Sequence, residues 1–187
     1  MIEFEICRLK ISFDFCFFTV IALMFVLSDE SQLIPAITAC IIHETGHLIP
    51  ITFCGKRISA IRFHGGGIKI IPAQEHIHPF LYDVIVMLGG CTANLLTSAM
   101  LAVRNPVFAA INFCIGIFNL LPYRSLDGGC FIEMVLEYFF PEHNIEIPLK
   151  IFCTLFSILL IFLIFTFAER NVTLIAVTVY LLATEFF

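Results

Sequence analysis

Long runs of apolar residues are the feature that most constrains how this chain can fold. The sequence of 187 residues is 60 % hydrophobic and only 13 % charged, whereas a soluble domain contains about 45–50 % apolar and about 25 % charged residues. A run of roughly 20 apolar residues can cross a bilayer as a helix, because a helix satisfies its own backbone hydrogen bonds in lipid. The composition therefore predicts a polytopic membrane protein.

The positions of these runs predict an all-α polytopic membrane protein with about six transmembrane helices, folded as a single domain over residues 1–187. The predicted spans are residues 11–28, 33–53, 79–103, 107–121, 149–168 and 172–187. Residues 57–72 differ, because apolar and polar side chains alternate there around Gly65-Gly66-Gly67. Alternation with a period of two around glycines predicts a small β-hairpin, which we expect on the membrane surface between the second and third spans.

The basic residues predict the orientation of these spans. Six spans place both termini on one side of the membrane. Eight of the ten Lys and Arg residues fall on that side, and two, Arg104 and Arg170, fall on the other. Because Lys and Arg collect on the cytoplasmic side, we expect cytoplasmic termini.

The second predicted span carries the chemical signature of the chain, the pattern H-E-x-x-H over His43-Glu44-Thr45-Gly46-His47. On a helix, His43 and His47 lie one turn apart on the same side, so their imidazoles can share one metal ion. Zinc suits two imidazoles and a carboxylate, with a fourth position open to water. Glu44 lies about 100° round the helix, where a general base for that water should sit.

Two other interpretations of this segment stay open. A single histidine on an apolar helix is usually a satisfied core residue, but two imidazoles and a carboxylate in apolar surroundings are costly unless something binds or pairs with them. Cys40 lies one turn before His43, so helix geometry would also allow it to reach the metal. The other cysteines form no C-x-x-C pair and are expected to act as small hydrophobic residues.

A third metal ligand must come from another part of the chain, and Asp127 is the candidate. It follows Pro122 and precedes Gly128-Gly129, so the backbone there is free of the preceding helix and can approach a neighbouring one closely. The alternative is that Asp127 caps a helix that starts at Gly128, as many aspartates do.

Together, the two segments resemble the site-2 protease family of intramembrane zinc metalloproteases. The family pattern, H-E-x-G-H in one span and N-x-L-P-x-x-x-L-D-G-G at a later one, is matched at residues 43–47 and 119–129. The resemblance is greatest to the bacterial branch that includes the stage IV sporulation protein FB. It runs from about the first span through Gly129, and the last two spans match only in being hydrophobic.

This resemblance implies that Asp127 is the third zinc ligand, beside His43 and His47, and that Asn94 lies near the site. In the family, Asn94 belongs to a G-P-x-x-N segment, in which this chain has Cys91 in place of proline. We expect the Asn94 amide to help stabilise an oxyanion or to position the substrate. Ser125 likewise stands where the sporulation branch usually has proline.

The predicted function is therefore that of a zinc-dependent intramembrane endopeptidase with Zn²⁺ as cofactor and Glu44 as its general base. Its partners would be the lipid bilayer and a membrane-associated pro-protein or regulator. Its location would be the bacterial cell membrane, with the active site opening to the cytoplasm. The first alternative is a catalytically silent family member acting as a scaffold or regulator, and the second is a small transporter with ionisable residues along an ion path. The ten Lys and Arg residues form no basic stripe, so nucleic-acid binding is not expected.

Overall fold

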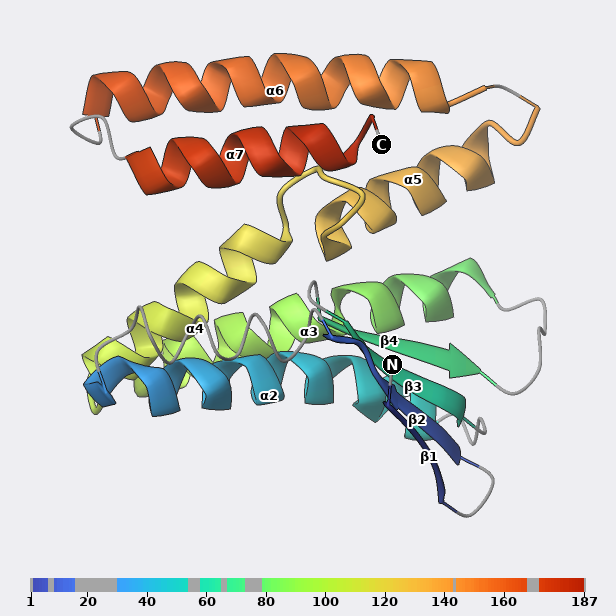
Figure 1. Ribbon diagram of the computed structural model, residues 1–187, viewed down its shortest axis with the longest axis vertical. Helices are drawn as coiled ribbons and strands as arrows, with labels where there is room; N and C mark the ends of the chain where they lie inside the picture. The colour runs from blue at the N-terminus through green and yellow to red at the C-terminus, as the bar shows by residue number, and fades with distance from the viewer. Residues whose placement is uncertain are drawn as a thin grey trace. The chain divides into compact units, whose positions relative to one another are not determined.

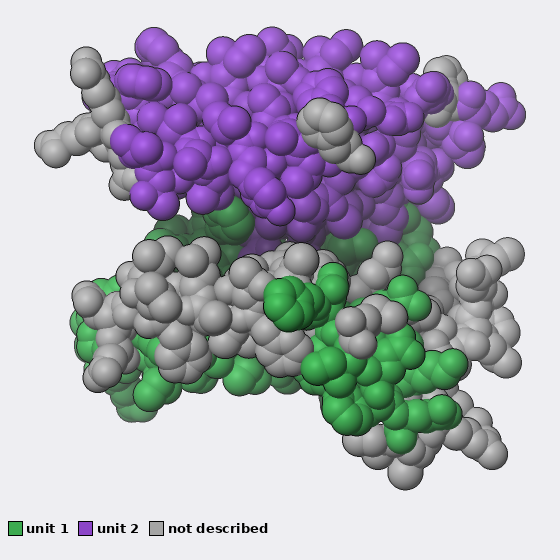
Figure 2. Space-filling model, in the orientation of Figure 1, with its two compact units in different colours: residues 1–118 green, residues 119–187 purple. Residues whose placement is uncertain are grey.

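The computed structural model describes residues 2–6, 9–15, 30–53, 58–64, 67–72, 79–142, 144–167 and 172–186. The chain divides into two compact units, residues 1–118 and residues 119–187, which Figure 2 colours separately. Each unit is described by itself.

The described residues of unit 1 form a four-stranded sheet and three helices (Figure 1). The strands are β1 (Ile2–Ile6), β2 (Leu9–Phe13), β3 (Ile58–His64) and β4 (Gly67–Pro72), and the helices are α2 (Glu30–Phe53), α3 (Phe80–Leu101) and α4 (Pro106–Asn119). Helices α2 and α3 pack directly against each other. Unit 2 contains α5 (Asp127–Phe139), α6 (Glu146–Phe167) and α7 (Val172–Thr184), of which α6 and α7 are in contact.

The predicted hairpin is present, but it is part of a larger sheet. Strands β3 and β4 pair antiparallel, and β1 and β2 form a second antiparallel pair. The two pairs are joined because β2 runs parallel to β3, with Ile11 opposite Ile61. The order in the sheet is therefore β1-β2-β3-β4.

The start of the first predicted span is wrong. Ile11–Phe13 belongs to strand β2 rather than to a helix. The reason is visible locally, because Ile11 and Phe13 alternate with Ser12 and Asp14, which is the period of a strand and not of a helix. The rest of that predicted span, from residue 16 to residue 28, lies outside the described residues.

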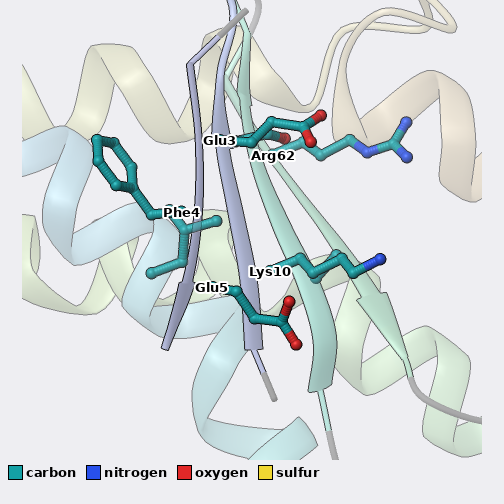
Figure 3. A pocket seen from close by; sticks show the side chains of 8 residues that line it. Glu3, Phe4, Glu5, Lys10 and Arg62 are labelled. Atoms are coloured by element: carbon teal, nitrogen blue, oxygen red, sulfur yellow. The ribbon is translucent and has the colours of Figure 1, made fainter. Parts of the chain in front are cut away.

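The two faces of the sheet carry different kinds of side chain, as Figure 3 shows around β1 and β2. Phe4 projects to one side, whereas Glu3, Glu5, Lys10 and Arg62 project to the other. A cavity of about 310 Å³ lies at these strands. Its lining consists of Glu3, Phe4, Glu5, Lys10, Ile11, Ser12, Ala60 and Arg62. This division of side chains is the expected result of strand alternation.

Three of the described helices are long and apolar enough to cross a membrane: Ser31–Phe53, Phe80–Leu101 and Glu146–Thr166. They correspond to the second, third and fifth predicted spans, and the last of them begins earlier than predicted. Helices α4 and α7 are apolar but have only 14 and 13 residues. At 1.5 Å per residue such helices are about 20 Å long, shorter than a hydrocarbon core of about 30 Å.

The pattern of buried and exposed side chains in these helices is the reverse of that in a soluble protein. In unit 1 most buried side chains are small or polar, such as Ala39, Cys91, Asn94 and Asn112, and Leu33 and Ile51 are the larger apolar ones among the described residues. Large apolar side chains are exposed instead, with Phe53 at 87 % and Met100 at 79 % of their full accessible surface. Small residues where helices meet and large apolar residues outside are typical of helices packed in lipid, where burial of apolar surface no longer drives association.

Candidate metal centre

The two histidines of the H-E-x-x-H pattern lie on α2 with their rings converging. Their Nε2 atoms are 3.3 Å apart, and the ring planes meet edge-on at 81° with centroids 4.9 Å apart. Two nitrogens bound at about 2.0–2.1 Å to a tetrahedral zinc ion lie about 3.3 Å from each other. The spacing of His43 and His47 therefore fits two ligands of one ion.

The tautomer of His47 is set by a backbone contact with α3. Its Nδ1 lies 2.7 Å from the carbonyl oxygen of Val86. A carbonyl oxygen can only accept, so Nδ1 carries the proton and Nε2 holds the free electron pair. A backbone or carboxylate acceptor on the second ring nitrogen is the usual means of orienting a metal-binding histidine.

Gly90 on α3 forms the floor beneath both imidazoles. A Cβ atom at this position would lie 2.8 Å from both Cε1 and Nε2 of His43, and closer still to Nε2 of His47. Glycine is therefore required here to leave room for the two nitrogens. Gly90 is not among the site residues predicted from the sequence, although two adjacent glycines in a helix cost about 1 kcal/mol each relative to alanine and so indicate a packing requirement.

The same helix crossing explains the glycine inside the pattern. A Cβ atom on Gly46 would collide with the backbone of Gly89, and one on Gly89 would collide with the backbone of Gly46. The two glycines let α2 and α3 approach closely, as small residues do between helices in membranes. This close approach brings the Val86 carbonyl and Gly90 to the histidines.

Asn94 ties the two helices together one turn further along. Its side chain is fully buried, and its amide nitrogen donates a hydrogen bond to the carbonyl oxygen of Ala39, at 3.2 Å. Ala39 lies one turn before His43, so this bond holds α2 next to the metal-binding turn. The expected role of Asn94 in oxyanion stabilisation or substrate positioning stays a prediction.

Two other side chains of α2 were considered for the site. Glu44 lies on α2 between the histidines and is half-buried. The thiol of Cys40 is exposed, whereas His43 is buried, so Cys40 does not share the packed side of α2 with that histidine.

Asp127 is found in unit 2, as the first residue of α5. The N-cap position belongs to Leu126, which contributes no capping side chain, so Asp127 is not the N-cap residue. The next two residues, Gly128 and Gly129, leave no room for a side chain. A Cβ atom on Gly128 would collide with the backbone of Leu120, and one on Gly129 would collide with the backbone of Tyr123. The loop thus folds tightly over the first turn of α5.

Comparison with solved structures shows a likeness over nearly the whole chain. A site-2 protease from Methanocaldococcus jannaschii superposes with a TM-score of 0.63, and the match covers 98 % of this chain and 93 % of that chain. The fold is that of a site-2 protease. Because the two sequences are only 19 % identical, this likeness shows the fold and not the activity. No protein-family model matches the chain, and no curated protein matches it.

Proposed function

We propose that this chain is a zinc-dependent intramembrane endopeptidase of the site-2 protease family. The observation that carries the proposal is the His43–His47 pair, whose Nε2 atoms have the separation of two zinc ligands above a glycine floor. The site-2 protease fold and the apolar helices support it. Placement in the stage IV sporulation protein FB-like branch rests on the sequence pattern of residues 119–129.

In this proposal His43, His47 and Asp127 hold one Zn²⁺ ion, supplying two imidazole nitrogens and one carboxylate oxygen. This donor set is the one expected for a catalytic zinc site, which keeps a fourth position open. Two features support the assignment of Asp127: it heads a helix whose first turn is rigidly packed by Gly128 and Gly129, and the structural likeness covers nearly the whole chain, both units included.

When bound, zinc would polarise a water molecule and lower its pKa to about 7. Glu44 would act as the general base, accepting a proton from water and returning it to the leaving amine of the cleaved peptide bond. His47 keeps its orientation throughout, because its Nδ1–H is held by Val86. Asn94 is proposed to stabilise the developing oxyanion or to position the substrate, with the amide N–H that Ala39 does not engage.

The proposed substrate is a membrane-associated pro-protein or regulator, cleaved in or near its membrane segment. A helical peptide bond is shielded, so the substrate must be extended before cleavage. With the six predicted spans, eight of the ten basic residues fall on the side of the termini and two on the other side. We therefore place the termini and the opening of the site in the cytoplasm of a bacterial cell membrane.

The decisive experiment separates metal binding from cleavage. Glu44→Gln should retain zinc and lower peptidase activity by about 10²- to 10⁴-fold, the usual contribution of a general base. Membranes from cells that make the variant should accumulate a precursor that wild-type cells process, as measured by comparative proteomics of the membrane fraction.

A matched control is available in unit 2. Glu137→Gln removes an exposed carboxylate of α5 and should leave both zinc content and processing unchanged. Unchanged processing in Glu44→Gln would overturn the proposed base. Zinc binding without processing in wild-type membranes would favour a catalytically silent scaffold.

A further inference from the structure

Side chains of α6 and of the residue that follows α7 form hydrogen bonds with three consecutive residues of the loop that precedes Asp127. The Cys153 thiol on α6 donates to the carbonyl oxygen of Pro122 at 2.8 Å. Ser157, one turn further on α6, lies 2.7 Å from the Tyr123 hydroxyl. Glu185, just after α7, accepts the backbone N–H of Arg124 at 2.6 Å. We call Cys153, Ser157 and Glu185 the loop clasp.

All three members of the loop clasp are buried, and so is Tyr123. Ser157 donates its own proton to the carbonyl oxygen of Cys153, so the Tyr123 hydroxyl must be the donor in their contact. Burial raises the pKa of Tyr123 above its ordinary value. The hydroxyl therefore keeps its proton at neutral pH and remains a donor.

Glu185 is the most unusual member, because it is a carboxylate with only 4 % of its surface exposed. One oxygen accepts the Arg124 N–H, and the other is buried with no hydrogen-bond partner among the described residues. Burying a carboxylate in this way is costly. A residue that contributed only packing would be apolar, so the cost indicates that the bond to Arg124 matters.

The peptide that Glu185 holds is also the one against which α5 packs. A Cβ atom on Gly129 would collide with the Tyr123 carbonyl group and would lie 2.5 Å from the backbone nitrogen of Arg124. Leu126 N–H donates to the Tyr123 carbonyl oxygen at 2.8 Å, and Cys130 N–H donates to Leu126 at 3.1 Å. The Tyr123–Arg124 peptide is thus fixed between Glu185 on one side and the first turn of α5 on the other.

The Arg124 side chain adds a second connection from this peptide to α5. Its guanidinium pairs with Glu133 on α5, with Nη2 2.8 Å from the carboxylate oxygen. Both side chains are partly exposed, so this ion pair alone contributes little. It does, however, join the residue held by Glu185 to the helix that Asp127 begins.

We propose that Glu185 is a positioning residue that holds Asp127 in place for metal binding by anchoring the Arg124 peptide. This inference rests on the proposed function, because it takes Asp127 as a zinc ligand. It assigns the α6–α7 pair a role that its apolar sequence does not indicate: the pair is the scaffold of the third ligand.

The test uses the purified full-length protein in detergent, loaded with cobalt(II), whose visible absorption reports the ligand set. Glu185→Ala should change the cobalt spectrum toward that of Asp127→Ala and weaken zinc binding by about 10- to 100-fold, as loss of an outer-shell partner does. Glu185→Gln keeps an oxygen acceptor for the Arg124 N–H and should restore both properties. Restoration by this conservative variant would not be expected if the charge alone contributed to stability.

Two further measurements keep the outcomes separate. Glu185→Asp shortens the side chain by one methylene and should reproduce the spectral change if Glu185→Ala fails to fold. Hydrogen exchange of the loop amides in metal-free protein should become faster in both variants. A folded Glu185→Ala or Glu185→Asp protein with the wild-type cobalt spectrum and wild-type exchange would overturn the inference while leaving the proposed function intact. If the wild-type protein binds neither metal, the proposed function fails and Glu185 loses its role in metal binding.

Discussion

The histidines and Asp127 are held in place by different means. His43 and His47 share one helix, their spacing follows from the helical period, and α3 places Gly90 and the Val86 carbonyl beside them. Asp127 heads a helix whose first turn depends on a loop, and that loop is held by side chains 31 to 61 residues further along the chain than the loop residues they contact. The spacing of the two histidines thus follows from local geometry, whereas the position of Asp127 depends on long-range contacts.

This difference predicts which substitutions should disrupt the histidine pair, the histidine half of the site, and which should disrupt Asp127, the aspartate half. The histidine half should fail when the space at its floor is filled, because its ligands are already aligned. The aspartate half should fail gradually, since several independent contacts hold the loop and losing one leaves the others. The following predictions test this contrast, beginning with the largest expected effect.

Removing a ligand of the histidine half should have the largest effect. His47→Ala takes away one of two aligned imidazoles and exposes the Val86 carbonyl to an empty space. We expect the purified protein to lose its zinc, as measured by elemental analysis, and to lose all peptidase activity. Zinc retained at the wild-type level would show that the ion does not bind at the H-E-x-x-H pattern.

Filling the space at Gly90 beside the two imidazoles should reduce zinc binding nearly as much. Gly90→Ala places a Cβ atom within 2.8 Å of His43 Nε2, so the nitrogens cannot keep their spacing. We expect zinc affinity to fall by more than about 100-fold, beyond the usual loss for an outer-shell partner, as measured by competition with a chelator.

Gly116→Ala is the control for this substitution. A Cβ atom at Gly116 meets the side chains of Leu95 and Asn94 at 3.2–3.3 Å, a tight contact that small shifts can relieve. Zinc affinity should therefore stay within a few-fold of wild type. Equal losses in both glycine variants would mean that helix packing, and not the space at the floor, limits metal binding.

Overpacking the contact between α5 and the loop before Asp127 should cause a moderate loss of stability. Gly129→Ala forces a methyl group against the Tyr123 carbonyl, and overpacking of this kind costs about 1–3 kcal/mol. The thermal unfolding midpoint in detergent should fall, and the loop amides should exchange faster. An unchanged midpoint would show that the loop can move away from α5 without cost.

Loosening one contact of the loop clasp should have the smallest effect. Tyr123→Phe removes the hydroxyl that donates to Ser157, but Ser157 keeps its bond to the Cys153 carbonyl. The expected loss is about 0.5–1.5 kcal/mol of stability, with zinc content unchanged. A loss of zinc from this variant would show that the clasp acts as one unit and not as separate contacts.

Local patterns in the sequence were sufficient for several parts of the structure. The period of α2 places His43 and His47 side by side, and the alternation around Gly65-Gly66-Gly67 identifies the β3–β4 pair. The apolar runs identify three helices of membrane-spanning length. These features depend on neighbours a few residues apart, so helical and strand periodicity is enough to detect them.

Other parts were decided by contacts between distant segments. Alternation at Ile11–Phe13 is local, but the place of this strand in the sheet depends on its parallel partner β3, about 50 residues away. The need for glycine at position 90 appears only when α3 is packed against the imidazoles of α2. The role of Glu185 appears only when α7 reaches the Arg124 peptide. A periodic pattern reports which side of an element is apolar, but it carries no record of which distant backbone group that side will meet.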